Sequence, residues 1–374
     1  MKKEIILYGV GDLGPCRDKP ESIFQDVSHI FKEGDISFGQ LEPVFSRRGT
    51  PLPQSRLPMR CDPAGAKAIK DAGFDVISFA TNHCMDWGRE AFYDTIEALN
   101  NQNLLCIGAG KDIFEARKSV IIKRDDTKVA FLGYNSILPQ GYFADERRPG
   151  CAPLRGFTIY EQIEHDQPGT PARIHTYPHR DDMKALIADV KKAKEEADIV
   201  IVSIHWGLHF IPSVIADYQR DYAYAAIDAG ADLILGHHSH ILKPIEVYKR
   251  KVIFYSLANF ALDPPHKFAE GGVLSGKSHT ELQELNPDWK KAPEKPMPTD
   301  SFKTIIAKCY IEDKKIIKVS YMPVDINMDT YNPKAVTADS PKFDEIMNYM
   351  SQITKEQKIN TEYLKNMDEV EIVL

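Results

Sequence analysis

The sequence lacks the features that mark disulfide-rich, membrane-spanning or nucleic-acid-binding proteins. No stretch approaches the roughly 20 consecutive apolar residues of a membrane span. A net charge of −7 and a pI near 6.0 argue against nucleic acid as the main partner. Cysteine is scarce, and no Cys-x-x-Cys pair occurs among Cys16, Cys61, Cys84, Cys106, Cys151 and Cys309. We therefore expect reduced, mostly buried thiols, neither a disulfide framework nor a thiolate zinc cage.

The first residues also lack the pattern of a secretory signal. Two lysines are followed by a short apolar run that Glu4 and Asp12 bracket, and no small-residue cleavage site follows it. The apolar fraction of 43% and the charged fraction of 27% are those of an ordinary soluble globular protein. These features predict a cytoplasmic protein with ample chain for a large core.

Apolar runs alternate with amphipathic segments along most of the chain, which predicts an α/β fold. The predicted strands are 4–10, 35–41, 74–80, 104–107, 120–123, 128–134, 198–204, 232–235, 251–257, 302–310, 315–322 and 370–374. The predicted helices are 19–32, 63–72, 87–101, 181–196, 215–229 and 342–353.

We expect a single domain over residues 1–374 with its core at about 4–262. Residues 138–178 and 271–299 have no clear period and are expected to form loop excursions. Residues 302–374 are expected to complete the fold as a C-terminal extension with a β-hairpin and a helix.

Polar side chains that can bind metals follow five of the predicted strands. They stand in the segments Gly11-Asp12, Leu41-Glu42, Asn82-His83, His205-Trp206 and Gly236-His237-His238-Ser239-His240. The carboxyl ends of strands form one edge of an open α/β sheet, so residues far apart in sequence can meet there. Carboxylates, an amide and imidazoles without a thiolate suit one or two Mn, Fe or Zn ions.

Each of these residues also has an ordinary explanation. Asp12 could cap a turn, Glu42 before Pro43 could be a surface charge, and Asn82 could form an Asx turn. Asp86 could be the N-cap of the helix that follows it. That all five strand ends are ordinary at once is the less favoured interpretation.

The histidine-rich segment holds two imidazoles with a definite relation to each other. His238 and His240 are two residues apart, so in extended backbone they point the same way. We therefore expect them to serve neighbouring positions of one metal site.

The ordered set of motifs over residues 4–262 resembles a known family. The matching stretches are Gly11-Asp12, Leu41-Glu42, Asn82-His83-Cys84-Met85-Asp86-Trp87-Gly88, Gly108-Ala109-Gly110, Pro149-Gly150-Cys151-Ala152-Pro153, Ser203-Ile204-His205-Trp206-Gly207, Gly230-Ala231-Asp232, Gly236-His237-His238-Ser239-His240 and Tyr255-Ser256-Leu257-Ala258-Asn259-Phe260. Together they resemble the CapA family, the poly-γ-glutamate capsule synthesis proteins, within the calcineurin-like metallophosphoesterase superfamily. The resemblance implies a four-layer αββα metallophosphoesterase-like sandwich with its site at the sheet edge.

Carried over by position, the resemblance implies six metal ligands, namely Asp12, Glu42, Asn82, His205, His238 and His240. It implies His83 as the acid that protonates a leaving group, oriented by Asp86. His237 is expected to lie beside the ligands without binding the metal itself. The superfamily generally opens with Asp-x-His, whereas this chain has Gly14 at the third position. One ion therefore lacks an expected imidazole, and occupancy by two ions is in question.

The reaction implied is metal-dependent hydrolysis of a phosphoester or a γ-glutamyl or other amide bond by a metal-bound hydroxide, associated with poly-γ-glutamate or capsule synthesis. Arg60 and Arg155 are candidates for holding a small anionic or glutamyl-polymer substrate, because arginine binds phosphate and carboxylate through two hydrogen bonds. A solvated loop charge is the alternative for each. The alternative function is a non-catalytic accessory or binding component of a polyglutamate synthesis system.

Overall fold

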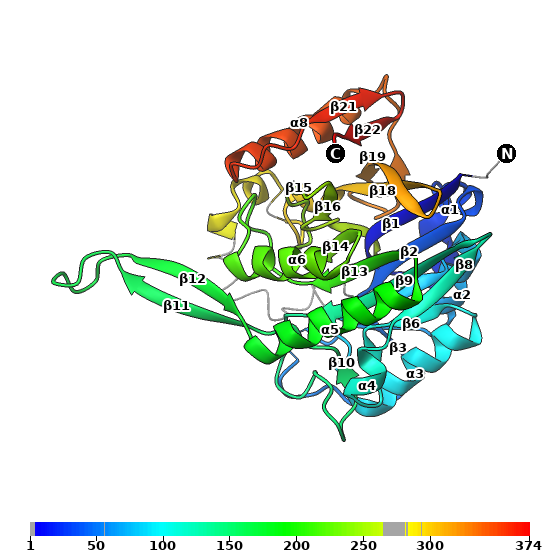
Figure 1. Ribbon diagram of the computed structural model, residues 1–374, viewed down its shortest axis with the longest axis horizontal. Coiled ribbons are helices and arrows are strands. Elements are labelled where there is room, and N and C mark those ends of the chain that lie inside the picture. The colour runs from blue at the N-terminus through cyan, green and yellow to red at the C-terminus, as the bar shows by residue number, and fades with distance from the viewer. Residues whose placement is uncertain (1–3, 56, 265–280, 282, 293) are drawn as a thin grey trace.

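The computed structural model describes residues 4–55, 57–264, 281, 283–292 and 294–374 and is built around two large β-sheets (Figure 1). The larger sheet runs in the order β21-β22-β19-β18-β1-β2-β5-β6, with β17 paired to β1 and β20 to β19. Its strands are β1 (Ile5–Gly14), β2 (Ile36–Leu41), β5 (Val76–Ser78), β6 (Leu105–Ile107), β17 (Asn259–Leu262), β18 (Lys303–Glu312), β19 (Lys315–Ile326), β20 (Pro333–Ala335), β21 (Tyr363–Asn366) and β22 (Glu369–Ile372).

The smaller sheet runs in the order β15-β16-β14-β13-β9-β8. Its strands are β8 (Val120–Arg124), β9 (Thr127–Asn135), β13 (Ile199–His205), β14 (Leu233–His237), β15 (Ile245–Tyr248) and β16 (Lys251–Phe254). Strands β9, β13, β14 and β16 are mutually parallel, so their carboxyl ends lie along one edge. That edge carries His205 and His237.

Short strand pairs and helices complete the described part of the chain. The pairs are β3 (Val44–Phe45) with β4 (Arg60–Cys61), β7 (Ala109–Gly110) with β10 (Gly150–Cys151), and β11 (Gly156–Gln162) with β12 (Ala172–Pro178). The helices are α1 (Ser28–Glu33), α2 (Ala64–Ala72), α3 (Gly88–Asn101), α4 (Ile113–Ala116), α5 (Arg180–Glu196), α6 (Asp217–Ala229) and α8 (Pro341–Glu356), with 3-10 turns η1 (Pro20–Phe24), η3 (Pro287–Lys291) and η4 (Thr299–Phe302). None of the helices in the described ranges combines the length and apolar character needed to span a bilayer.

Three apolar clusters hold these elements together. One joins the facing sides of the two sheets, where the rings of Phe38 on β2 and Phe131 on β9 stack with centroids 6.0 Å apart. A second packs the larger sheet against α1, α2 and α3, and a third packs the smaller sheet against α5 and α6. Burial of apolar area at about 25 cal/mol per Å² is the main force that fixes the sheets against each other. The predicted mixed α/β class is confirmed.

The structure differs from the predicted elements in several places. β1 continues through Asp12 to Gly14, and β14 continues to His237, because pairing with neighbouring strands extends both beyond their apolar runs. The helix expected over 19–32 is the 3-10 turn η1 followed by α1. The loop expected over 138–178 contains the hairpin β11–β12, which projects from the body in Figure 1. Part of the excursion expected over 271–299 lies outside the described residues, and η3 occupies part of the remainder.

The expectation that all cysteines are reduced is wrong for one pair. Cys16 and Cys61 form a disulfide, with Cα atoms 4.7 Å apart, although 45 residues separate them in sequence. The fold brings Cys61 on β4 beside Cys16, which follows β1, and no spacing rule within the sequence could reveal this contact. Cys84, Cys106, Cys151 and Cys309 are free thiols.

Replacing both Cys16 and Cys61 by serine should lower the free energy of unfolding by about 4 kcal/mol, because the bond closes a long loop in the unfolded chain. Chemical denaturation without reductant measures this difference. Adding reductant should destabilise the wild-type protein and leave the double variant unchanged. Equal midpoints for both proteins without reductant would show that the bond contributes no stability.

Candidate metal centre

Asp12 lies within β1, at the point where this strand approaches the loop before β17. The Asp12 N–H donates to the Ala258 carbonyl at 2.9 Å, and Asp12 is in register with Asn259. A Cβ on Gly11 would lie 1.8 Å from the Ala258 oxygen, so only glycine allows the two backbones to come this close. Gly11 therefore fixes where the Asp12 carboxylate points.

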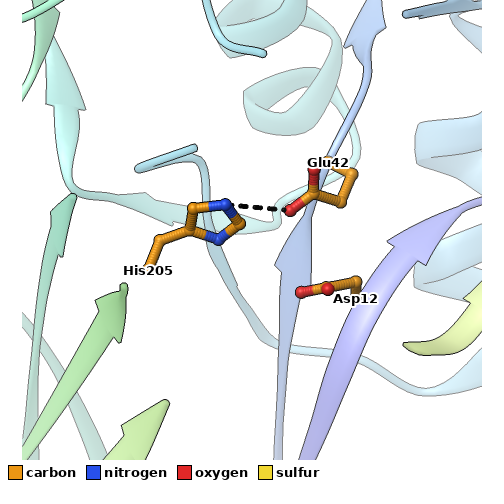
Figure 2. Close-up of side chains that lie close together, drawn as sticks. All are labelled: Asp12, Glu42 and His205. Carbon is orange, nitrogen blue, oxygen red and sulfur yellow. Dashed lines mark ion pairs between the residues drawn. The ribbon is translucent and has the colours of Figure 1, made fainter. Parts of the chain in front are cut away.

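Asp12, Glu42 and His205 form the most compact group of possible metal ligands in the described residues. One ligand atom from each lies within 4.8 Å of the others, and all three side chains are fully buried (Figure 2). The His205 Nε2 lies 3.4 Å from the Glu42 Oε1. Asp12 and Glu42 come from the larger sheet and His205 from the smaller, so the site bridges the two sheets.

The other predicted ligands surround this group. The Asn82 Oδ1 lies 2.6 Å from the His205 Nε2, and the His238 Nδ1 lies 3.2 Å from the same nitrogen. The His240 Nδ1 lies 3.4 Å from the Asp12 Oδ2 and 2.7 Å from the Asn259 Oδ1. The structure thus brings together all six residues that the sequence nominated.

The backbone that carries His238 and His240 is not extended, as the sequence argument assumed. Both residues have left-handed φ angles, 89° and 56°. This conformation is uncommon outside glycine and costs of order 1–3 kcal/mol at each residue. As a result the two imidazoles diverge, so that His238 meets His205 while His240 meets Asp12.

Buried oxygens without partners show whether this group fits a cation. All four carboxylate oxygens of Asp12 and Glu42 are buried and accept no hydrogen bond from the described residues. Burying an unpaired charge is very costly, so a pair of such carboxylates requires protons or a positive ion. Burial, and then the charge of Asp12, raises the pKa of Glu42 to about 7. The donor set fits a divalent metal.

Three of the neighbouring imidazoles, those of His205, His237 and His238, are in the protonation state that metal binding needs. Burial, followed by the other histidines, lowers the pKa of His205 and His238 well below the usual value. Burial also lowers the pKa of His237 to about 4, although Asp12 opposes the shift. Neutral imidazoles present free lone pairs to a cation.

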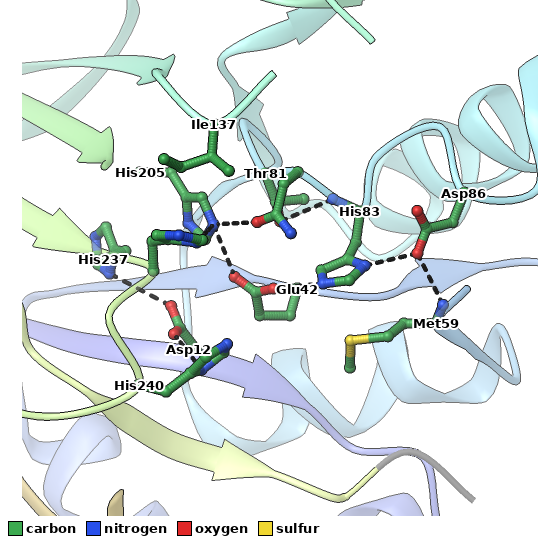
Figure 3. Close-up of polar contacts among 12 residues, drawn as sticks. Asp12, Glu42, Met59, Thr81, His83, Asp86, Ile137, His205, His237 and His240 are labelled. Carbon is green, nitrogen blue, oxygen red and sulfur yellow. Dashed lines mark hydrogen bonds and ion pairs between the residues drawn. The ribbon is translucent and has the colours of Figure 1, made fainter. Parts of the chain in front are cut away.

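His83 and Asp86 form a hydrogen-bonded pair beside this group (Figure 3). The His83 Nδ1 lies 2.6 Å from the Asp86 Oδ2, and its Nε2 lies 3.7 Å from the Glu42 Oε2. Burial alone would lower the pKa of His83, but Asp86 and then Glu42 raise it to about 9. His83 is therefore available as a proton donor at neutral pH.

Three further donors fix the Asp86 carboxylate. The Ser55 hydroxyl donates to Oδ1 at 2.7 Å, the Tyr142 hydroxyl to Oδ1 at 2.9 Å, and the Met59 N–H to Oδ2 at 2.8 Å. A carboxylate held this way keeps the proton of His83 on Nδ1 and orients the ring. The role as a helix N-cap does not apply, because Trp87 precedes α3 and no side-chain cap is formed there.

The two arginines nominated for substrate binding have protein partners. The Arg60 guanidinium lies 3.6 Å from the centroid of the Trp87 ring, and its side chain is exposed. Arg155 forms a two-bond ion pair with Asp182, at 2.6 and 2.8 Å. Arg60 forms no ion pair with the described residues, so its N–H groups can bind an anion. The guanidinium of Arg155 already binds Asp182.

Sequence reasoning gave no role to several residues that the fold adds to the site. These are Asn259, Tyr142, Ser55 and His209, whose ring lies 3.9 Å from that of His238. Asn259 belongs to one of the matching motifs, but it is far from His240 and Asp12 in sequence. The sequence therefore gave no indication that these residues are in contact. Tyr142 and Ser55 lie in segments without periodicity, which hide single polar contacts.

The sequence of this chain matches one known protein family over most of its length. The family described as "Bacterial capsule synthesis protein PGA_cap" matches residues 16–264, which is more than half of the chain. The chain belongs to this family. The resemblance drawn from the motifs is thereby confirmed, and the match contains every nominated ligand except Asp12.

Two PGA_cap relatives illustrate the similarity. The PGA biosynthesis protein CapA of Bacillus subtilis (strain 168) is 34% identical over 245 residues, which cover 65% of this chain and 57% of that protein. The capsule biosynthesis protein CapA of Bacillus anthracis is 31% identical over 244 residues, which cover 64% and 54%. The match therefore spans just over half the length of these curated relatives.

Solved structures that resemble this PGA_cap chain include the calcineurin-like phosphoesterase YfkN from Bacillus subtilis. Its sequence identity is 12% and its TM-score 0.44, with 95% of this chain and 98% of that chain covered. A likeness of this size carries no argument about activity.

A divalent ion should stabilise the protein, because it neutralises the unpaired carboxylates of Asp12 and Glu42. At 100 times the dissociation constant, Mn²⁺ should add about 2.7 kcal/mol to the free energy of unfolding. Differential scanning calorimetry before and after chelation measures the shift.

The matched control is the double variant Asp12→Asn/Glu42→Gln, which removes both charges with little change in shape. It should be at least as stable as metal-free wild type and should not respond to Mn²⁺. An equal response in both proteins would place the ion elsewhere.

Proposed function

We propose that the chain is a metal-dependent hydrolase. The observation that carries this proposal is the fully buried pair Asp12 and Glu42, whose oxygens accept no hydrogen bond from the described residues and lie close to the imidazole of His205. Asp12, Glu42, Asn82, His205, His238 and His240 are the residues that would hold one or two divalent ions. A bound ion of this kind lowers the pKa of water and stabilises negative charge on the substrate oxygen.

The protein's own contribution to the reaction is positioning and proton transfer. His83 carries its exchangeable proton on Nε2, on the side of Glu42, while Asp86 holds Nδ1. A leaving oxygen or nitrogen bound there receives that proton as the scissile bond breaks. The positive charge of His83 also opposes the charge that develops on the substrate.

The proposed substrate is a phosphoester or a γ-glutamyl bond of an anionic polymer. The names of the two Bacillus relatives associate them with capsule and PGA synthesis, which supports a glutamyl polymer. The exposed guanidinium of Arg60 is available to an anion near Asp86.

The four-layer αββα arrangement is part of this proposal, and the three apolar clusters between the sheets and helices support it. A single domain and a cytoplasmic location remain predictions.

A non-catalytic accessory role is the second candidate. It is favoured by Gly14, which supplies no imidazole where metallophosphoesterases generally have one. Such a protein would bind the polymer and leave it intact.

Replacing His83 by alanine should lower the hydrolytic rate about 10²–10⁴-fold while leaving metal content unchanged, because the proton donor is lost but the ligands remain. The assay screens phosphomonoesters, phosphodiesters and γ-glutamyl peptides with Mn²⁺ present. His29→Ala, an exposed histidine on α1, is the matched control and should behave as wild type.

Three outcomes would contradict the proposal. A wild-type protein that contains no metal after purification and binds none would remove the metal centre. Metal binding without hydrolysis of any substrate class would favour the accessory role. Full activity in His83→Ala would assign the proton donor to another group.

Replacing Tyr142 by phenylalanine should lower kcat about ten-fold with little change in KM, because one of the donors that orient Asp86 is lost. Steady-state kinetics, with any substrate that the screen identifies, measures kcat and KM separately. Tyr93→Phe, at an exposed tyrosine on α3, is the control. Equal kinetics in Tyr142→Phe and wild type would show that the remaining donors hold Asp86 unaided.

A further inference from the structure

β1 supplies no imidazole to the Asp12 side of the metal centre, because Gly14 stands two residues after Asp12. A Cβ on Gly14 would lie 2.5 Å from the Leu262 Cδ1 and 3.1 Å from the Pro43 Cδ. Two side chains occupy the space beside Gly14, and a larger residue there would require the Leu262 side chain to move. Because β1 contains no histidine, any further nitrogen for an ion at Asp12 has to come from another strand.

His237 lies where such a nitrogen is needed. It is the last residue of β14, and strand alternation places its side chain on the same face as Leu233 and Leu235, which pack between the two sheets. Its Nδ1 lies 3.8 Å from the Asp12 Oδ1, and the side chain is fully buried (Figure 3). His240 approaches the other oxygen of the same carboxylate, at 3.4 Å.

Both ring nitrogens of His237 lack a hydrogen-bond partner among the described residues. Buried polar groups almost always have one, and leaving such a group unpaired costs about 1–3 kcal/mol. Its ring packs near Phe38, with centroids 5.8 Å apart, which offers no polar contact.

The separation from Asp12 favours a shared ion over a direct contact. A distance of 3.8 Å is too long for a hydrogen bond between the two groups. Two ligands that each lie about 2.1 Å from one ion can be at most about 4.2 Å apart, so this distance is compatible with coordination.

We propose that His237 is a metal ligand, which together with Asp12 and His240 holds a second ion beside the one at Glu42, Asn82, His205 and His238. This inference rests on the proposed metal centre and extends it.

The test is metal stoichiometry of the full-length protein after chelation and reloading with Co²⁺. Inductively coupled plasma mass spectrometry should find two equivalents in wild type and one in His237→Leu. Isothermal titration should show the loss of one binding step, and the visible Co²⁺ spectrum should lose intensity. His179→Gln, a half-buried histidine at the start of α5, is the control and should keep two equivalents.

The variants are first shown to fold by far-ultraviolet circular dichroism and thermal unfolding. His237→Gln keeps a polar side chain of similar size and is measured beside His237→Leu, so that failure of one variant to fold does not end the test. A folded variant of either kind that binds as much Co²⁺ as wild type overturns the assignment of His237 and leaves the hydrolase proposal intact. A wild type that binds no Co²⁺ overturns both.

Discussion

Two buried carboxylates, Asp12 and Glu42, share one small space where the two sheets meet, and the arrangement of the site depends on how their charge is balanced. Neither has a hydrogen-bond donor within the described residues, and their mutual repulsion adds to the cost of burial. A fold that only needed stability would place apolar side chains there. The protein instead places imidazoles beside them and adopts left-handed backbone conformations at His238 and His240. In the proposed metal centre, a bound cation would offset these costs.

The position of this site follows from the way the two sheets meet. β1 and β2 bring the carboxylates, β13 and β14 bring imidazoles, and the apolar cluster between the sheets holds the two edges in register. A change in the packing of residues such as Phe38 and Phe131 would alter the distance between acid and imidazole ligands. The stability of the core and the geometry of the metal centre are therefore set by the same contacts.

Much of this could be predicted from the sequence because strands end where apolar runs end. Asp12, Glu42, Asn82, His205, His238 and His240 follow such runs, the family resemblance marked them as candidate ligands, and the structure brings them together. The direction of a side chain was harder to predict. His238 and His240 were expected in extended backbone, whereas pairing of β14 with its neighbours ends at His237 and frees the backbone beyond it. The partners Asn259 and Tyr142, and the disulfide from Cys16 to Cys61, depend on contacts between distant segments, which no local pattern encodes.

The Cys16–Cys61 bond has a meaning for the site beyond its effect on unfolding. Cys16 follows shortly after Asp12, and Cys61 lies just beyond Met59, whose N–H holds Asp86. One covalent bond thus joins the segment that carries Asp12 to the segment whose backbone holds Asp86. Reduction of this bond would therefore allow the spacing between the two halves of the candidate site to change.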